Sequence, residues 1–246
     1  MNRYQLLIEY VGTNFRGWQI QKKGLTIQGL IQEKLKKLLK EKIILNGSGR
    51  TDTGVHAIEQ SAHFDCENEI IDLVKFLKSI NHFLNDQGIA IKKIKKRSNE
   101  FHSRFSAKQR IYKYIIFNQI NAPIIEKKRG WHVRKPLDLE LIKKGAKKLV
   151  GTNDYSTFRS SSCHAKSPIK TIKSVKIRSS VNKIEIEFNS QSFLQQQVRS
   201  MVGCLKYLGE KKWDLKMFEK VFKSKKRILC APPAPPEGLF LVRIIY

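Results

Sequence analysis

The chain has 246 residues, of which 41% are hydrophobic, so it is long enough for one large domain or two smaller lobes with a buried core. Its 48 Lys and Arg residues outnumber 21 Asp and Glu residues, and the resulting net charge of +27 makes nucleic acid the leading partner. The same abundance of Lys, with Ile and Asn, also fits an A/T-rich genome without selection for binding. The four cysteines form no Cys-x-x-Cys pair, and no apolar stretch could span a bilayer. Zinc sites, disulfide frameworks and membrane spans are thus disfavoured, and a cytoplasmic protein is expected.

The first half of the chain predicts the order strand, helix, strand, strand, helix, strand. Tyr4, Leu6, Ile8 and Tyr10 alternate as in a strand, and Thr26 can cap a helix whose apolar residues repeat at helical spacing. The later elements are expected near 42–48, 59–65, 70–83 (a helix carrying Ile71, Val74 and Leu77) and 88–96. This is the element order of a ferredoxin-like unit.

The second half predicts a similar order. Residues 110–118 form a strongly β-prone run, and Asp138 can cap a helix that Gly151 closes. Strands are then expected at 170–178 and 183–189, helices at 193–208 and 214–223, and a last strand at 238–245.

The two halves together predict an α+β fold with mainly antiparallel sheets, helices on one side and a catalytic cleft between the halves. We expect an N-terminal half over 1–105 and a C-terminal half over 106–246, each contributing to the cleft.

One loop carries the chemistry. Residues 47–57 read Gly-Ser-Gly-Arg-Thr-Asp-Thr-Gly-Val-His-Ala, and the three glycines allow a sharp backbone path and close approach by a ligand. Arg50 can pair with Asp52 and hold its carboxylate ionised and oriented, ready to act as a base, a metal ligand or a covalent nucleophile. Taken alone, the same pattern also fits a structural turn held by an ion pair.

The loop and several further segments, in order over nearly the full chain, resemble the tRNA pseudouridine synthase A family. Arg50-Thr51-Asp52-Thr53-Gly54-Val55-His56 resembles the family's active-site motif. The other matching segments are Tyr10-x-Gly12-x-x-Phe15-x-Gly17-Trp18-Gln19, Thr26-Ile27-Gln28, Phe101-His102-Ser103-Arg104-Phe105-Ser106-Ala107, Tyr112-Lys113-Tyr114, Asp154-Tyr155-x-x-Phe158, Val198-Arg199-x-x-Val202-Gly203 and Pro235-Pro236-Glu237-Gly238-Leu239.

The resemblance implies a pseudouridine synthase fold and a role for each matching residue. Asp52 would be the nucleophile and Arg50 its ion-pair partner. Tyr112 would pack against the target base, Leu239 would line the pocket, and Arg199 would contact the substrate.

The implied reaction isomerises uridine to pseudouridine at positions 38, 39 and 40 in the anticodon arm of tRNA. The resemblance implies neither a metal nor an organic cofactor, and it suggests a homodimer with the tRNA spanning both subunits. The attack of the carboxylate on C1′ or on C6, and a glycal route, all remain open.

One segment departs from the family pattern. Gln195, Gln196 and Gln197 stand where the family commonly has His and Met, and Ser200 stands where it has Asn. The helical pattern survives, so the departure bears on RNA contacts made from this turn and not on the fold.

Several other residues have structural interpretations. Phe15, Trp18 and Tyr155 could stack on bases but favour core packing, and His56, His63 and His102 match no zinc spacing. The proline-rich run over 231–236 favours a stiff loop that aims Leu239 into the cleft.

The sequence offers three rival functions. Asp52-Thr53-Gly54 suggests an aspartic protease, but no second such motif supplies the other carboxylate. A base deaminase lacks its zinc signature. A noncatalytic basic RNA-binding protein is the strongest alternative, and turnover on uridine-containing tRNA, rather than binding alone, discriminates it from an enzyme.

Overall fold

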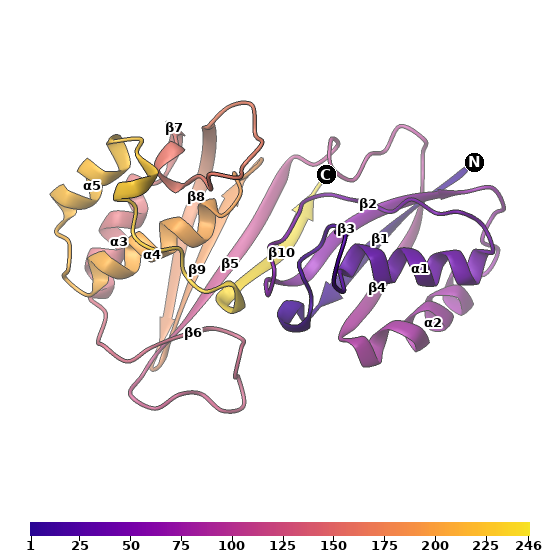
Figure 1. The fold of residues 1–246 in the computed structure, drawn as a ribbon, viewed down its shortest axis with the longest axis horizontal. Coiled ribbons are helices and arrows are strands. Elements are labelled where there is room, and N and C mark those ends of the chain that lie inside the picture. Colours follow the sequence, from indigo (N-terminus) through magenta and orange to yellow (C-terminus); the bar gives the residue numbers. More distant parts are fainter. The chain divides into compact units, whose positions relative to one another are not determined.

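The protein is a mixed α+β chain with mostly antiparallel strand pairing, and the computed structural model describes residues 1–246 (Figure 1). It divides into two compact units, residues 1–108 with 240–246 and residues 109–239. The last strand, β10 (Leu239–Ile245), therefore lies mostly in the first unit, although the sequence placed it with the second half. It pairs in parallel with β3, Phe240 opposite His56. A pairing over so long a sequence separation leaves no local signal.

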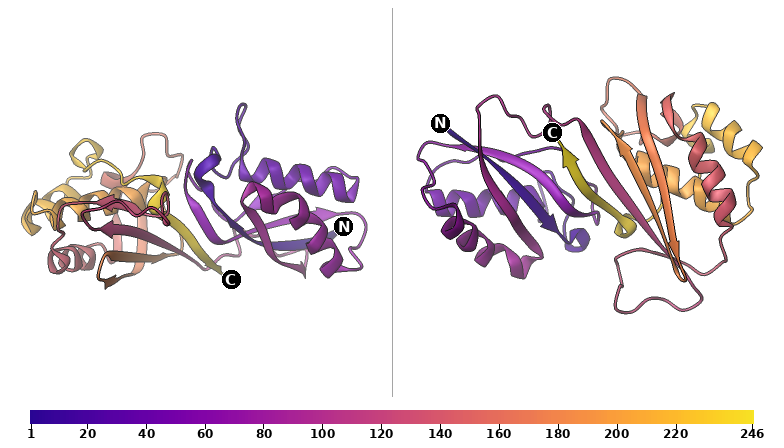
Figure 2. Two further views of the ribbon diagram at one scale, coloured as in Figure 1. Left: turned by 90° about the horizontal axis from the view of Figure 1, so that it is seen from below. Right: turned by 180° about the vertical axis from the view of Figure 1, so that it is seen from behind.

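The first unit has the strand and helix order that the sequence predicts. Its elements are β1 (Asn2–Tyr10), α1 (Ile27–Leu39), β2 (Asn46–Gly47), β3 (His56–Cys66), α2 (Leu73–Leu84) and β4 (Ile89–Arg97). Strand β1 lies between β4 and β3 and is antiparallel to both, and the short β2 pairs antiparallel with β3. Helices α1 and α2 lie side by side on one face of this sheet (Figures 1 and 2). This is the antiparallel arrangement of a ferredoxin-like unit.

The two helices of this unit begin at side-chain caps. Thr26 accepts a hydrogen bond from the backbone N–H of Gly29 at the start of α1, as predicted. Asp72 caps α2, so this helix starts at Leu73 rather than near residue 70. Ile71 is consequently 97% exposed and precedes the helix, and the buried apolar side chains of α2 are Ile80 and Leu84. The prediction that Ile71 lies on this helix was wrong.

The second unit consists of a β-sheet and three helices. Its elements are β5 (Gln109–Asn118), β6 (Trp131–Val133), α3 (Leu139–Lys148), β7 (Gly151–Asp154), β8 (Ile169–Ser180), β9 (Lys183–Ser190), α4 (Gln197–Gly209) and α5 (Leu215–Lys223). Strand β9 lies between β5 and β8, β7 pairs with β8, and all these pairings are antiparallel, whereas β6 is parallel to β5. Strands β6 and β7 are too short to have been predicted from periodicity.

Capping also sets the helices of the second unit. Asp138 accepts from the backbone N–H of Leu141 and starts α3, as the sequence predicts. Helix α4 starts at Gln197, later than the predicted residue 193, because Gln196 adopts a left-handed backbone with φ of 61°. Helices α3, α4 and α5 pack against one another (Figure 2). No helix of the protein is both long and apolar enough to cross a membrane.

Candidate active site

The loop that carries Asp52 connects β2 to β3 and is held at its backbone. The N–H of Trp18 donates to the carbonyl oxygen of Thr51 (3.1 Å), and the N–H of Val55 donates to that of Asp52 (3.1 Å). Gly54, third residue of the turn that the second bond closes, has φ of 80°, which glycine adopts without steric cost. The residue that precedes Asp52 and the turn that follows it are thus both fixed.

Buried side chains support the same loop from below. The hydroxyl oxygens of Tyr10, in β1, and Thr51 lie 2.8 Å apart, and both residues are buried. The side-chain amide of Gln60 donates to the carbonyl oxygen of Gly49 (2.7 Å). His56, the first residue of β3, accepts from the backbone N–H of Gly12 (3.1 Å). This hydrogen bond fits the structural role that we expect for His56.

The N-terminal motif packs its glycines directly on this loop. A Cβ atom at Gly12 would lie 1.9 Å from the carbonyl oxygen of Val55, and one at Gly17 would lie 2.6 Å from that of Thr51. Gly17 also has φ of 81°. In the sequence these glycines stand only as part of a motif, and nothing there indicates that they let two backbones touch. The Tyr10–Thr51 contact was missed as well, and the spacing of the motif carried no signal for it.

Asp52 and Arg50 differ in their exposure. Asp52 is half-buried, whereas Arg50 is exposed. The predicted pairing of Arg50 with Asp52 stays a prediction.

The central motif after residue 100 supports β3 from the other end. Ser103 donates through its backbone N–H to Nδ1 of His63 (3.2 Å) and through its hydroxyl to the carbonyl oxygen of Asn46 (2.6 Å). The rings of His63 and His102 lie 4.6 Å apart. Burial, followed by the nearby His102 and Arg3, lowers the pKa of His63 to about 4, so this buried imidazole is neutral at neutral pH.

Tyr112 lies in β5 of the second unit, two residues before Tyr114 and on the same face of the strand. It is 8% exposed, and its ring meets that of Phe193 edge to face at 5.2 Å. The hydroxyl of Tyr114 donates to the carbonyl oxygen of Pro235 (2.7 Å). Burial, and then the charge of Glu237, raise the pKa of Tyr114 well above its usual value, so this tyrosine is an uncharged hydrogen-bond donor.

The proline-rich segment that precedes Leu239 docks on α4. Arg199 donates through Nε to the carbonyl oxygen of Ala234 (2.7 Å), and its own carbonyl oxygen accepts from the N–H of Ala234 (2.9 Å). A Cβ at Gly203 would lie 2.1 Å from the carbonyl oxygen of Pro232. Arg199 thus holds the segment that leads to the buried Leu239.

The glutamines that depart from the family pattern lie at the start of α4. Gln197 is fully buried, and its side-chain oxygen accepts from the backbone N–H of Leu194 (2.8 Å). Ser200 is buried too, and its hydroxyl accepts from Arg227 (2.9 Å). Both substitutions therefore serve the packing of the turn, whereas Gln195 and Gln196 are more exposed.

The sequence model of one family, described as tRNA pseudouridine synthase, matches residues 6–106 and 146–246, which is most of the chain. The chain belongs to the tRNA pseudouridine synthase family. It is 72% identical over 246 residues to the tRNA pseudouridine synthase A of Pelagibacter ubique, with full coverage of both proteins. It is 39% identical to the enzyme of that name from Zymomonas mobilis and 38% identical to the one from Parvibaculum lavamentivorans, again over the full length of each protein.

Membership of the tRNA pseudouridine synthase family confirms the resemblance drawn from the motifs and makes the chain an isomerase that modifies RNA. The protease and deaminase alternatives have no support in these comparisons. The two groups of predicted site residues belong to different units, Arg50 and Asp52 to the first and Tyr112, Arg199 and Leu239 to the second. No group of three or more His, Cys, Asp or Glu side chains is arranged to hold a metal ion.

Proposed function

We propose that this synthase isomerises uridine to pseudouridine at positions 38, 39 and 40 in the anticodon stem-loop of tRNA, with Asp52 as the nucleophile. The observation that carries the proposal is the Asp52 loop itself. Its backbone is fixed by Trp18 and Val55, and its floor by buried groups, while Asp52 stays half-buried. A simple surface turn would not need this support. Family membership and the matching motif supply the class of reaction.

The reaction needs no redox step and no added group. The N1–C1′ bond breaks, a bond forms between C5 and C1′, a proton leaves C5, and N1 takes up a proton, so the product is an isomer of the substrate. A fixed, ionised carboxylate can assist by attack at C1′ or C6 or by promoting a glycal intermediate. We propose that the exposed Arg50 pairs with Asp52 and orients its carboxylate.

The residues of the second unit would serve the base. An intrahelical uridine cannot present its glycosidic bond to a protein loop, so the target nucleotide must leave the stack at a cost of a few kcal/mol. The proposal has Tyr112 pack against the extruded base and Leu239 line its pocket. The Arg199–Ala234 hydrogen bonds support this, because they fix the segment that ends at Leu239.

The partners follow from the same proposal. A net charge of +27 suits a polyanionic tRNA, and we propose that the protein acts in the cytoplasm as a homodimer, as the resemblance implies. Light scattering on the purified protein measures the oligomeric state, and a monomeric mass at working concentrations would contradict the dimer.

Pseudouridine mapping on tRNA transcripts tests the position of the reaction. Transcripts that carry uridine at only one of positions 38, 39 and 40 should each gain pseudouridine at that position. A matched transcript with cytidine at all three positions should gain none. Modification elsewhere in the tRNA, or of the cytidine control, would overturn the proposed site while leaving the family's reaction in place.

A further inference from the structure

Two cysteines that the proposed reaction does not use lie together in the second unit. The Sγ atoms of Cys204, in α4, and Cys230, which ends the short helix Arg227–Leu229, are 3.4 Å apart, and both thiols are free. A disulfide has an S–S bond of about 2.05 Å, so closure needs a shift of roughly 1.4 Å. The helix that precedes Cys230 is exposed, with Ile228 89% and Leu229 46% accessible, so it has room for such a shift.

The two thiols have different surroundings. Cys204 is 1% exposed, whereas Cys230 is half-buried. Arg227 lies beside the pair, since its guanidinium donates to the hydroxyl of Ser200 (2.9 Å), and Cys230 Sγ is 4.0 Å from the carbonyl oxygen of Ser200. The hydrogen bond from Cys204, and then the charge of Arg227, lower the pKa of the Cys230 thiol, whereas the same hydrogen bond and burial raise that of Cys204. A half-buried thiol of lowered pKa beside a buried thiol is the arrangement that reacts with oxidants and then resolves to a disulfide.

We propose that Cys230 and Cys204 form a peroxide-reactive dithiol that closes reversibly to an intramolecular disulfide. The Cys230 thiolate attacks one oxygen of hydrogen peroxide and breaks the O–O bond, giving a sulfenic acid and hydroxide, which takes up a proton to become water. The Cys204 thiol then attacks the sulfenic sulfur, which forms the S–S bond and releases a second water. Both sulfurs are oxidised, peroxide is reduced, and a dithiol reductant reverses the step.

The disulfide would tie down a defined part of the molecule. Cys230 immediately precedes the proline-rich segment, and Ala234 of that segment exchanges two hydrogen bonds with Arg199 on α4. A bond between Cys204 and Cys230, which are 26 residues apart, closes a loop around α5 and fixes the start of this segment to α4. Closing such a loop restricts the unfolded chain, so the oxidised protein should melt at a higher temperature.

Thiol counting and peptide mapping test the proposal on the full-length protein. After treatment with a small excess of hydrogen peroxide, the number of thiols titrated in denaturant should fall from four to two, and mapping should find a Cys204–Cys230 link that dithiothreitol removes. Cys163→Ser is the matched control, because it removes another buried thiol and should leave the link intact. In Cys204→Ser, Cys230 should instead be trapped as a sulfenic acid by dimedone.

The wild-type protein alone can decide the matter if a variant fails to fold. Four free thiols after peroxide treatment, or a disulfide that joins any other pair of cysteines, would overturn the proposal. The outcome is independent of tRNA turnover, so it leaves the proposed nucleophile untouched.

Discussion

At the scale of single residues, Tyr112 can serve the target uridine in two ways. Its ring can stack on the base, which is worth about 1–3 kcal/mol, and its hydroxyl can transfer a proton. We expect both roles, so Tyr112→Phe should lower the rate roughly 10²–10⁴-fold while tRNA affinity holds, and Tyr112→Leu should lower it further. Single-turnover rates at saturating enzyme measure this. Near wild-type activity in Tyr112→Phe would show that Tyr112 acts only by stacking. Full activity in Tyr112→Leu would show that Tyr112 has no role in the reaction and only packs in the core.

His63 makes a prediction for pH. Its pKa is about 4 in the folded protein and 6.5 in the unfolded chain, so between these values the unfolded chain binds a proton that the folded protein does not. The free energy of unfolding should therefore fall as the pH drops from 6.5 to 4, by up to about 3 kcal/mol. Burial also lowers the pKa of His102, which adds a loss of the same sign. Carboxylates with a lowered pKa affect the free energy of unfolding only at still lower pH.

Urea unfolding between about pH 7 and pH 4.5 checks this loss. His63→Asn keeps a hydrogen-bond acceptor and removes the titration, so its stability should depend less on pH than that of the wild type. The exposed His82 offers a control, since His82→Asn should keep the wild-type slope. If the free energy of unfolding of His63→Asn and of the wild type depended on pH in parallel, His63 would not be the cause of the loss.

At the scale of elements, the close approach of the N-terminal motif to the Asp52 loop should affect stability and activity more than the backbone freedom of its glycines. Gly17→Ala adds a Cβ only 2.6 Å from the carbonyl oxygen of Thr51, at a residue with φ of 81°. Gly88 has a similar φ of 73°, but its Cβ would lie 3.6 Å from its nearest neighbour. Gly88→Ala should cost about 1 kcal/mol of stability, and Gly17→Ala about 2–3 kcal/mol together with most of the activity. If the two substitutions had equal effects on denaturant unfolding and on turnover, the close packing of Gly17 against the loop would not be what supports it.

Local signals predicted most elements, and nonlocal packing explains the differences. Thr26 and Asp138 cap their helices as expected because a cap is read from a few neighbouring residues. The start of α4 was placed too early because Gln196 adopts a left-handed backbone, which the apolar spacing of its neighbours does not reveal. The parallel pairing of β10 with β3 joins distant segments, which periodicity cannot reveal.

In the candidate site, too, local sequence signals predicted some features, and the nonlocal contacts could not be predicted. Motif resemblance selected Asp52, Arg50, Tyr112, Arg199 and Leu239, and their roles remain predictions. Nothing in the spacing indicated that Tyr10 lies under Thr51, or that the Arg199 side chain holds Ala234. These supporting contacts depend on the tertiary structure and became visible only with it.

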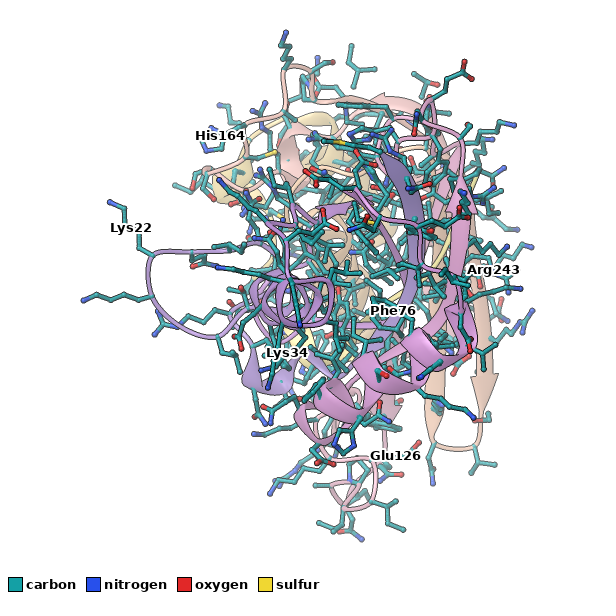
Figure 3. The ribbon with its side chains drawn as sticks, turned by 90° about the vertical axis from the view of Figure 1, so that its right-hand side faces the viewer. Lys22, Lys34, Phe76, Glu126, His164 and Arg243 are labelled. Atoms are coloured by element: carbon teal, nitrogen blue, oxygen red, sulfur yellow. The ribbon has the colours of Figure 1, made fainter.

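At the scale of the whole molecule, the net charge of +27 should govern binding. Each phosphate that the protein neutralises adds a slope of about −0.9 for duplex, or about −0.7 for single-stranded RNA, to log affinity against log salt. The exposed Lys22 projects away from the fold, in a position open to a polyanion (Figure 3). Filter binding of tRNA between about 50 and 200 mM salt should show a steep loss of affinity. A flat dependence would indicate that the high lysine content reflects genome composition and not tRNA binding.

Turnover by an Asp52 variant tests the proposed nucleophile most directly. Purified wild-type protein and the Asp52→Ala and Asp86→Ala variants would be compared for pseudouridine formed in an anticodon stem-loop tRNA under single-turnover conditions. Asp86 is an exposed carboxylate of the same unit, so its variant should keep wild-type turnover. Asp52→Ala should form no product while its tRNA affinity stays within a few-fold and its fold stability barely changes. Measurable turnover by a folded Asp52→Ala protein would contradict the assignment of the nucleophile.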